Sequence, residues 1–244
     1  MLQSLTHPTS RFSFLLRALG LALILLVLGI IVLNPLISHA ATWSSSNKWG
    51  TFTSKGYKVQ NEVWGSGAGP QTIWANSGNN WGIWANHPNT GGVKSYANSG
   101  FDINRSINSL QSVSSSFNVT VPNKGAYETA YDIWSNHSAY EVMLWMNKTG
   151  PIGPIGSFQR NVSVGNYNWN VYKGSNGKNA VFSFLNTGST RSGTVNVLAV
   201  LRWIENTARW YGNVTLNTVQ FGFEITSSNG GMNFTCNYYN VSYK

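Results

Sequence analysis

The chain is poor in the residues that bind metals or form disulfides. Its 244 residues include one cysteine, Cys236, and four histidines. His7 and His39 fall in an apolar N-terminal segment, whereas His87 and His137 are fifty residues apart. This spacing matches no zinc-ligand motif, and a single cysteine cannot form a disulfide within the chain. We therefore expect no metal site, and we interpret Cys236 as a small buried hydrophobe in the last strand.

Charged residues are also scarce, at 9% of the chain, although the formal net charge is +9. No two basic residues are adjacent, and Arg11 and Arg17 lie in the N-terminal segment, so that removal of this segment would lower the charge by two. Nucleic-acid-binding domains gather Lys and Arg into patches or runs that follow the phosphates. The scattered charges therefore argue against nucleic acid as a partner.

Long apolar runs are confined to the N-terminus. After Arg11 and Arg17, the chain is apolar from Leu19 to Leu33, and the small residues of "SHA" precede Ala41. This order is typical of a signal peptide that is cleaved before Ala41. The run also approaches the length of a membrane span, so that a retained anchor remains the alternative. We expect export to the outside of the cell, a membrane association only if residues 1–40 are kept, and one domain over residues 41–244.

Most of this domain is predicted to be β-structure. Runs such as "YKVQNEVW", "AYETAYDIW", "NWNVYKG" and "AVFSFLN" are separated by Gly, Asn, Ser and Pro clusters. Only residues 192–210 show helical spacing, through Val197, Val200, Leu201 and Ile204. Many strands and one helix predict an all-β sandwich of two sheets.

A glycine-rich stretch, "GSGAGP" at residues 65–70, does not support a nucleotide cofactor. It follows a predicted strand but runs into Pro70 instead of opening a helix. The dinucleotide fingerprint requires that helix. We interpret the stretch as a loop and expect no cofactor.

The seven carboxylates of the chain are the informative residues. In "YEVMLWM", Glu141 lies inside an apolar run, where an ionised carboxylate is costly unless it has a partner. Alternation places Glu141, Met143 and Trp145 on one face of this strand, with apolar residues on the other. In "QFGFEI", the same count separates Glu224 from the core residues, and Gly222 leaves room for a close approach to the backbone.

Two carboxylates on such faces suit the hydrolysis of a glycosidic bond. One carboxyl group protonates the leaving oxygen, and the other meets the positive charge that develops at the anomeric carbon. A carboxylate, a thioether and an indole on one strand face also suit a groove that holds a sugar ring. From the pattern alone, two unrelated structural glutamates remain the alternative.

Five segments resemble glycoside hydrolase family 12, the β-1,4-glucanases that include xyloglucanases. They are "KWGTFTSKGYKVQNEVWG", "AYDIW", "YEVMLW", "GPIGPIGS" and "QFGFE". The resemblance runs from Trp49 to the C-terminus and implies a β-jelly roll of two antiparallel sheets with a concave cleft over residues 41–244. It further implies endo-acting cleavage with retention of configuration, with Glu141 as nucleophile, Glu224 as acid/base, and Asp132 hydrogen-bonded to the nucleophile.

The resemblance also suggests residues that bind the sugar. Trp64 and Trp145 match aromatic positions that line subsites, and Met143 matches a residue beside the nucleophile. Glu62 and Glu128 stand where the family commonly has Asn, which changes polar groups expected in the cleft. Counting by twos puts both near the catalytic carboxylates, and five close carboxylates cannot all ionise cheaply. This crowding predicts an acid-active enzyme, with an optimum at or below about pH 5.

Three functions therefore follow from the sequence. The first is a secreted, monomeric endo-β-1,4-glucanase that acts on cellulose-like or related β-glucans. The second is a family 11 xylanase, which shares the jelly roll. The third is a sugar-binding module that cuts nothing, which the two strand-borne glutamates disfavour because binding needs no acid/base pair.

Overall fold

The computed structural model describes residues 41–244. The predicted export segment, residues 1–40, lies outside the described residues. Among residues 41–244, no helix combines the length and the apolar character that a membrane span requires.

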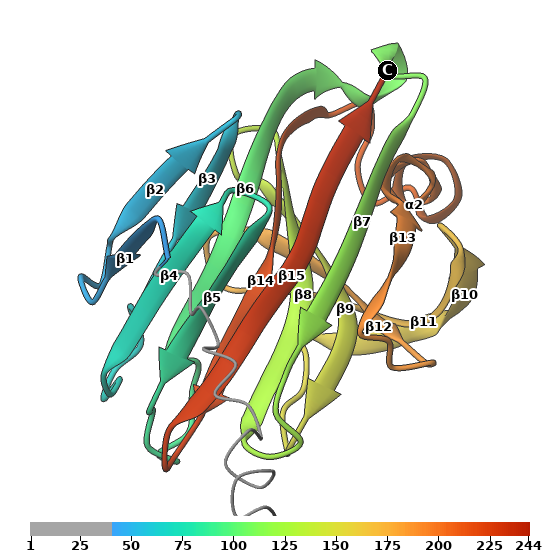
Figure 1. The fold of residues 1–244 in the computed structure, drawn as a ribbon. Helices are drawn as coiled ribbons and strands as arrows, with labels where there is room; N and C mark the ends of the chain where they lie inside the picture. Colours follow the sequence, from blue (N-terminus) through green and yellow to red (C-terminus); the bar gives the residue numbers. More distant parts are fainter. Residues whose placement is uncertain (1–40) are drawn as a thin grey trace, which may run out of the picture. The chain divides into compact units, whose positions relative to one another are not determined.

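Two β-sheets pack face to face in this domain (Figure 1), as the sequence predicts. The smaller sheet has six strands, which are, in spatial order, β1 (Trp43–Ser45), β4 (Gln71–Ser77), β5 (Asn80–Ala85), β15 (Met232–Tyr243), β7 (Val113–Thr120) and β13 (Ser192–Asn196). The larger sheet has nine, which are β10 (Ser157–Val164), β11 (Tyr167–Ser175), β12 (Ala180–Asn186), β9 (Tyr140–Thr149), β8 (Ala126–Ser135), β14 (Thr215–Ser227), β6 (Ser95–Ser106), β3 (Tyr57–Gln60) and β2 (Thr51–Ser54).

The core lies between the sheets and is rich in aromatic rings. Phe221 of β14 lies between Phe117 of β7, at 5.0 Å between ring centroids, and Tyr131 of β8, at 4.7 Å. Tyr239 of β15 stacks on Phe221 at 5.5 Å. Cys236, also in β15, is buried and free, as predicted. Offset and edge-to-face rings add about 0.5–1.5 kcal/mol per pair beyond the area they bury, so these contacts tie the two sheets together.

One pair of neighbouring strands in the larger sheet is parallel, where the sequence predicted antiparallel sheets. β12 lies between β9 and β11 and runs parallel to β9. After β9 the chain passes over the place of β12 and β11, forms the β10–β11 hairpin and returns as β12. The crossing segment is "GPIGPIGS", residues 150–157. Alternation along a strand carries no information about this order, because the order depends on contacts between distant segments.

Two other elements are shorter than predicted. The helix α2 spans only Val197–Trp203, because Ser192–Asn196 pairs with β7 as a strand and Asn196 then caps the helix, accepting from the Ala199 N–H at 3.1 Å. A π-helical turn, η2 (Ile204–Ala208), follows α2, and a short 3₁₀ helix, η1 (Ile107–Ser109), follows β6. The strand predicted over 57–64 stops at Gln60, since Glu62 adopts a left-handed φ of 39°.

Candidate active site

A cleft of about 770 Å³ crosses the outer face of the nine-stranded sheet. At one end it is lined by Glu62 and Trp64, which follow β3, and at the other by Ile155 of the crossing segment and Asn176 after β11. Between these ends, β6, β14, β8 and β9 supply the floor. The cleft therefore runs across the strands, as a groove for an extended polymer would.

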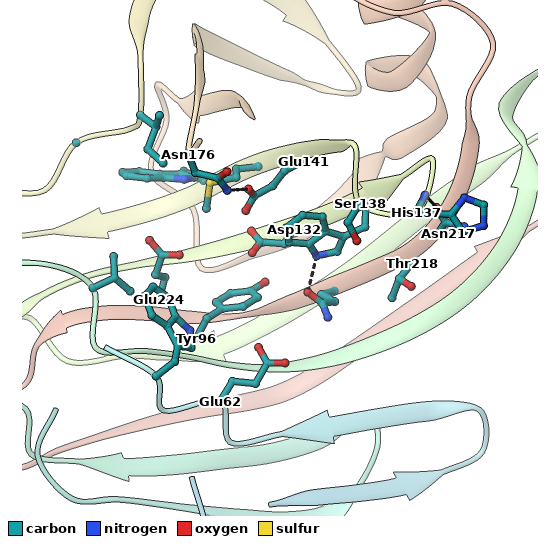
Figure 2. A pocket seen from close by; sticks show the side chains of 18 residues that line it. Glu62, Tyr96, Asp132, His137, Ser138, Glu141, Asn176, Asn217, Thr218 and Glu224 are labelled. Carbon is teal, nitrogen blue, oxygen red and sulfur yellow. Dashed lines mark hydrogen bonds between the residues drawn. The ribbon is translucent and has the colours of Figure 1, made fainter. Parts of the chain in front are cut away.

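The two predicted catalytic glutamates lie on strands that flank β8. Glu141 of β9 is opposite Trp134 of β8, and Glu224 of β14 is opposite Glu128 of β8. Asp132 of β8 is opposite both Met143 of β9 and Gln220 of β14. Figure 2 shows the carboxyl groups of Glu141, Asp132 and Glu224 on the same wall of the pocket. Period-2 alternation thus sends these carboxyl groups into the cleft and their apolar neighbours into the core.

Close packing of β6 against β14 explains why a glycine, Gly222, lies two residues before Glu224. A Cβ on Gly222 would lie 2.0 Å from the carbonyl oxygen of Ala97 and 2.7 Å from the Cα of Asn98. The sequence predicted a close approach to the backbone at Gly222, and β6 makes that approach. A larger residue would push β6 away and displace Glu224.

Burial and mutual repulsion raise the pKa values of the carboxyl groups in the cleft. Burial, and to a lesser degree the charge of Glu224, raises the pKa of Glu141 to about 7. Asn176 donates to Oε2 of Glu141 at 3.3 Å, which favours the ionised form. Burial also raises the pKa of Glu224. Because burial and the charge of Glu224 both disfavour ionisation of Glu141, Glu141 keeps its proton at pH values where an isolated glutamate has lost it.

Asp132 is buried between the two glutamates and is unsatisfied within residues 41–244. Its Oδ1 has no hydrogen-bond partner there, and no hydrogen bond joins Asp132 to Glu141. Burial, followed by the charges of Glu141, Glu224 and Glu62, raises the pKa of Asp132 well above its ordinary value. A protonated Asp132 can donate one hydrogen bond, which an ionised one cannot.

Glu128 occupies a position beneath Glu224 and is not among the residues that line the cleft. It is 2% exposed, faces Glu224 across the β8–β14 ladder and Lys148 across the β8–β9 ladder. Burial, followed by the charge of Glu224, raises the pKa of Glu128 well above its ordinary value. Its Oε1 has no hydrogen-bond partner within residues 41–244.

Glu62 does line the cleft, although it is not part of a strand. Its carboxylate accepts from the Gln60 side chain at 3.0 Å and from the Asn98 side chain at 2.9 Å. Burial raises the pKa of Glu62, and the Asn98 hydrogen bond and the charge of Lys58 oppose this rise. Asn98 thereby holds Glu62 at the wall of the cleft.

The two tryptophans predicted to bind sugar differ sharply in exposure. Trp64 is 51% exposed at one end of the cleft, so its ring is free to stack on a ligand. Trp145 is only 4% exposed and packs with Met143, Ala130 and Val181 beneath Ile152 of the crossing segment. Both tryptophans line the cleft, but Trp145 also holds the wall together.

Comparison with known proteins identifies the family. A model of glycosyl hydrolase family 12 matches residues 43–243. The chain belongs to glycosyl hydrolase family 12. Endoglucanase S of Pectobacterium parmentieri is 31% identical over 153 residues, a match that spans 57% of each chain. A probable xyloglucan-specific endo-beta-1,4-glucanase A of Aspergillus flavus is 30% identical over 235 residues, which cover 87% of this chain and 97% of that protein.

Solved structures agree with the family assignment. The xyloglucanase domain of NopAA, a type three effector from Sinorhizobium fredii, in complex with cellobiose, matches with a TM-score of 0.81 at 39% identity, over 84% of this chain and 100% of that one. A native family 12 xyloglucanase from Bacillus licheniformis matches with a TM-score of 0.73 at 27% identity, over 83% and 100%. The predicted jelly roll is thus confirmed. The family 12 chain is a glycoside hydrolase of the endoglucanase and xyloglucanase type, and the xylanase and binding-module alternatives are set aside.

Several residues that line the cleft of this family 12 enzyme were not predicted from the sequence. Trp134 donates from Nε1 to Gln220 at 2.9 Å, and Tyr96 donates to the carbonyl of Ala130 at 3.2 Å. Alternation could have found Trp134 and Gln220, because they lie two residues from Asp132 on β8 and directly opposite it on β14. Thr218 lies opposite Trp134 in β14, and Asn217 lies at the irregularity just before it. The remaining residues depend on loop placement. They are Val93, His137, Ser138, Gly153, Ile155 and Asn176.

Proposed function

We propose that this family 12 enzyme is a secreted endo-acting β-1,4-glucanase that hydrolyses β-glucans with retention of anomeric configuration. The observation that carries the proposal is the pair Glu141 and Glu224, which line one open cleft from the strands on either side of β8. The relatives named above as endoglucanases and xyloglucanases, and the relative solved with cellobiose, support a β-glucan as the substrate.

In the first step, the carboxylate of Glu141 attacks the anomeric carbon, and Glu224 gives its proton to the oxygen of the departing chain. In the second step, water attacks the anomeric carbon while Glu224 takes its proton, and the bond between the sugar and Glu141 breaks. This mechanism requires the two carboxyl groups about 5–5.5 Å apart at the moment of reaction. The charge of Glu224 acts directly on the pKa of Glu141, which is consistent with carboxyl groups that share one pocket.

The neighbouring acids would adjust the protonation of this pair. Asp132, kept protonated by burial, would donate a hydrogen bond to Glu141 once the cleft is occupied and so stabilise the carboxylate as nucleophile and leaving group. Glu128 would act through Glu224, because it lies opposite that residue in the β8–β14 ladder and does not line the cleft. Trp64 would stack on a glucosyl ring, with Met143, Trp145 and Glu62 completing the wall.

The test is the anomeric form of the first product. Hydrolysis of a soluble β-glucan followed by ¹H NMR should give β-configured reducing ends that equilibrate only later, together with a rapid fall in viscosity from internal cleavage. An initial α-anomer would overturn retention, and a slow, linear fall in viscosity would overturn endo action. A panel of linear, mixed-linked and xylose-branched glucans, with xylan as the control, would identify the preferred substrate.

Export rests on residues 1–40 and has its own test. Expression of the full chain in a bacterium should release a protein that begins at Ala41. A full-length chain in the membrane fraction would instead support the anchor, and a full-length chain in the cytosol would contradict both. The expected monomer can be checked on the same material by light scattering.

A further inference from the structure

Two aromatic residues, Phe158 and the half-buried Tyr172, lie at one end of the nine-stranded sheet. Phe158 of the edge strand β10 is 53% exposed, and its ring meets that of Tyr172 of β11 edge to face, at 5.6 Å between centroids. Leaving a large aromatic side chain in water forgoes about 1.5–3 kcal/mol of burial. Neither ring belongs to the core or to the cleft described above.

The register of the sheet puts this pair on the cleft face. Phe158 is opposite Tyr172, Tyr172 is opposite Ser183 of β12, and Ser183 is opposite Met143 of β9, whose side chain lines the cleft. Residues directly opposite in a ladder point to the same face. Neighbouring strands are about 4.8 Å apart, so Tyr172 is about 10 Å and Phe158 about 14 Å from β9 across the sheet. Figure 1 shows β10 and β11 as the strands that end the sheet on this side.

The cleft reaches toward this pair through the crossing segment. Ile155, three residues before Phe158, lines the end of the cleft and is itself exposed. Its Cγ2 would lie 3.0 Å from a Cβ on Gly174 of β11, so the absence of a side chain at Gly174 lets Ile155 rest on the sheet. Ile155, Phe158 and Tyr172 therefore continue the apolar floor beyond Asn176.

Polar groups accompany the two rings. Asn161 of β10 is opposite Asn170 of β11, and Asn170 is opposite Leu185 of β12, which is opposite Trp145 in the cleft. The side-chain amides of Asn161 and Asn170 consequently point to the same face as the two rings. They lie next to the rings along the strands. An aromatic plane beside amide groups is suited to a sugar, whose ring faces are apolar and whose rim carries hydroxyls.

We propose that Phe158 and Tyr172, with Ile155, form an accessory binding site for the glucan chain beyond the catalytic cleft, which only long substrates reach. The proposal rests on the proposed function, because the occupant is the same β-glucan chain that lies in the cleft. Continuity with the cleft through Ile155 and the shared sheet face select this occupant.

The test compares a long and a short substrate. Phe158→Ala in the full chain should lower kcat/KM on carboxymethylcellulose by about 2- to 12-fold, the equivalent of one lost aromatic contact of about 0.5–1.5 kcal/mol, through KM and not kcat. The ratio of kcat/KM on the polymer to that on cellotriose should fall by the same factor. Phe158→Trp should restore it. Tyr238→Ala, which removes an exposed aromatic ring from β15 in the other sheet, is the matched control and should leave the ratio unchanged.

Binding without turnover separates this proposal from the proposed function. Retardation in a native gel that contains carboxymethylcellulose should be weaker for Phe158→Ala than for the parent, whether or not the parent hydrolyses the polymer. If the parent hydrolyses glucan and Phe158→Ala changes neither the ratio nor the retardation, the accessory site is overturned and the function stands. If the parent cuts no glucan but Phe158→Ala still reduces retardation, the function is overturned and the site stands. Equal effects of Phe158→Ala and Tyr238→Ala would also overturn the site.

Discussion

The two faces of strands β8, β9 and β14 are chemically opposite. The inner face carries side chains such as Tyr131, Leu144 and Phe221, which belong to the hydrophobic core between the sheets. The outer face carries Asp132, Glu141 and Glu224, whose burial raises the pKa of every one of them. The inner face stabilises the fold by burying apolar side chains. The outer face instead holds carboxyl groups whose pKa values are higher than they would be in water.

Removal of one catalytic carboxyl group from the outer face should have the largest effect on activity. Glu141→Gln and Glu224→Gln should each lower kcat by several orders of magnitude, since nucleophile and proton donor are lost separately. The unfolding temperature at pH 7 should not fall, because each change removes a carboxyl group from a crowded cluster. Steady-state kinetics and thermal unfolding check both expectations.

Chemical rescue gives the control for these variants. Azide should restore turnover in Glu141→Ala and yield an α-glycosyl azide, because the anion takes the place of the nucleophile. Near-normal turnover in either glutamine variant would contradict the assignment of roles.

Trp145 and Trp64 line the same cleft but differ in burial. Trp145→Ala should lower the free energy of unfolding by about 3–5 kcal/mol, since the ring is buried in a packed cluster. Trp64→Ala should leave stability nearly unchanged and weaken polysaccharide binding by about 0.5–1.5 kcal/mol, because its ring is exposed. Denaturant unfolding and KM separate the two effects. Equal losses of stability would show that Trp64 belongs to the core.

The outer face should also make stability depend on pH. The pKa of Glu141 rises from 4.5 to about 7 on folding, so its contribution is fully present below about pH 4.5 and is lost as the pH rises through 7. The loss is on the order of 3 kcal/mol. Thermal unfolding from pH 4 to pH 8 should show this decline, and Glu141→Gln should make it shallower, while Asp132 and Glu128 maintain the rest. A parent protein that becomes more stable across this range would contradict the direction of the shift.

Asp132→Asn should reduce activity less than loss of the nucleophile does. Asn keeps a donor but removes a titrating neighbour of Glu141, so the pH profile of kcat/KM should shift as well. Glu141→Gln assayed in parallel sets the scale of the loss. An unchanged rate and profile would reduce Asp132 to a structural residue.

The smallest expected effect concerns the two departures from the family pattern. Glu62 and Glu128 can donate a hydrogen bond only when protonated, whereas Asn donates at any pH. The combined change Glu62→Asn and Glu128→Asn should therefore move the optimum of kcat/KM upward from an acidic value in the parent. The two single changes should show whether Glu62, at the cleft wall, or Glu128, opposite Glu224, contributes more to the pH optimum. An optimum near neutrality that none of these changes moves would contradict the acid-active hypothesis.

Much of the site could be predicted because alternation is a local property. In "YEVMLWM" and "QFGFE", each carboxylate follows from its own neighbours, and the structure places Glu141 and Glu224 on the outer face as the count predicts. The count also put Glu62 at the cleft, but for the wrong reason, since β3 ends at Gln60 and a left-handed residue turns the chain there. Resemblance to family 12 supplied the roles, which alternation alone left open.

Local sequence is enough to predict which residues face away from the core, because a strand alternates whatever surrounds it. How these faces combine depends on the fold of the whole chain. It placed β12 between β9 and β11, buried Trp145 under Ile152, set Glu128 beneath Glu224, and aligned Phe158 with the cleft. The lateral order and register of strands depend on contacts between residues far apart in the chain, and no local period encodes those contacts.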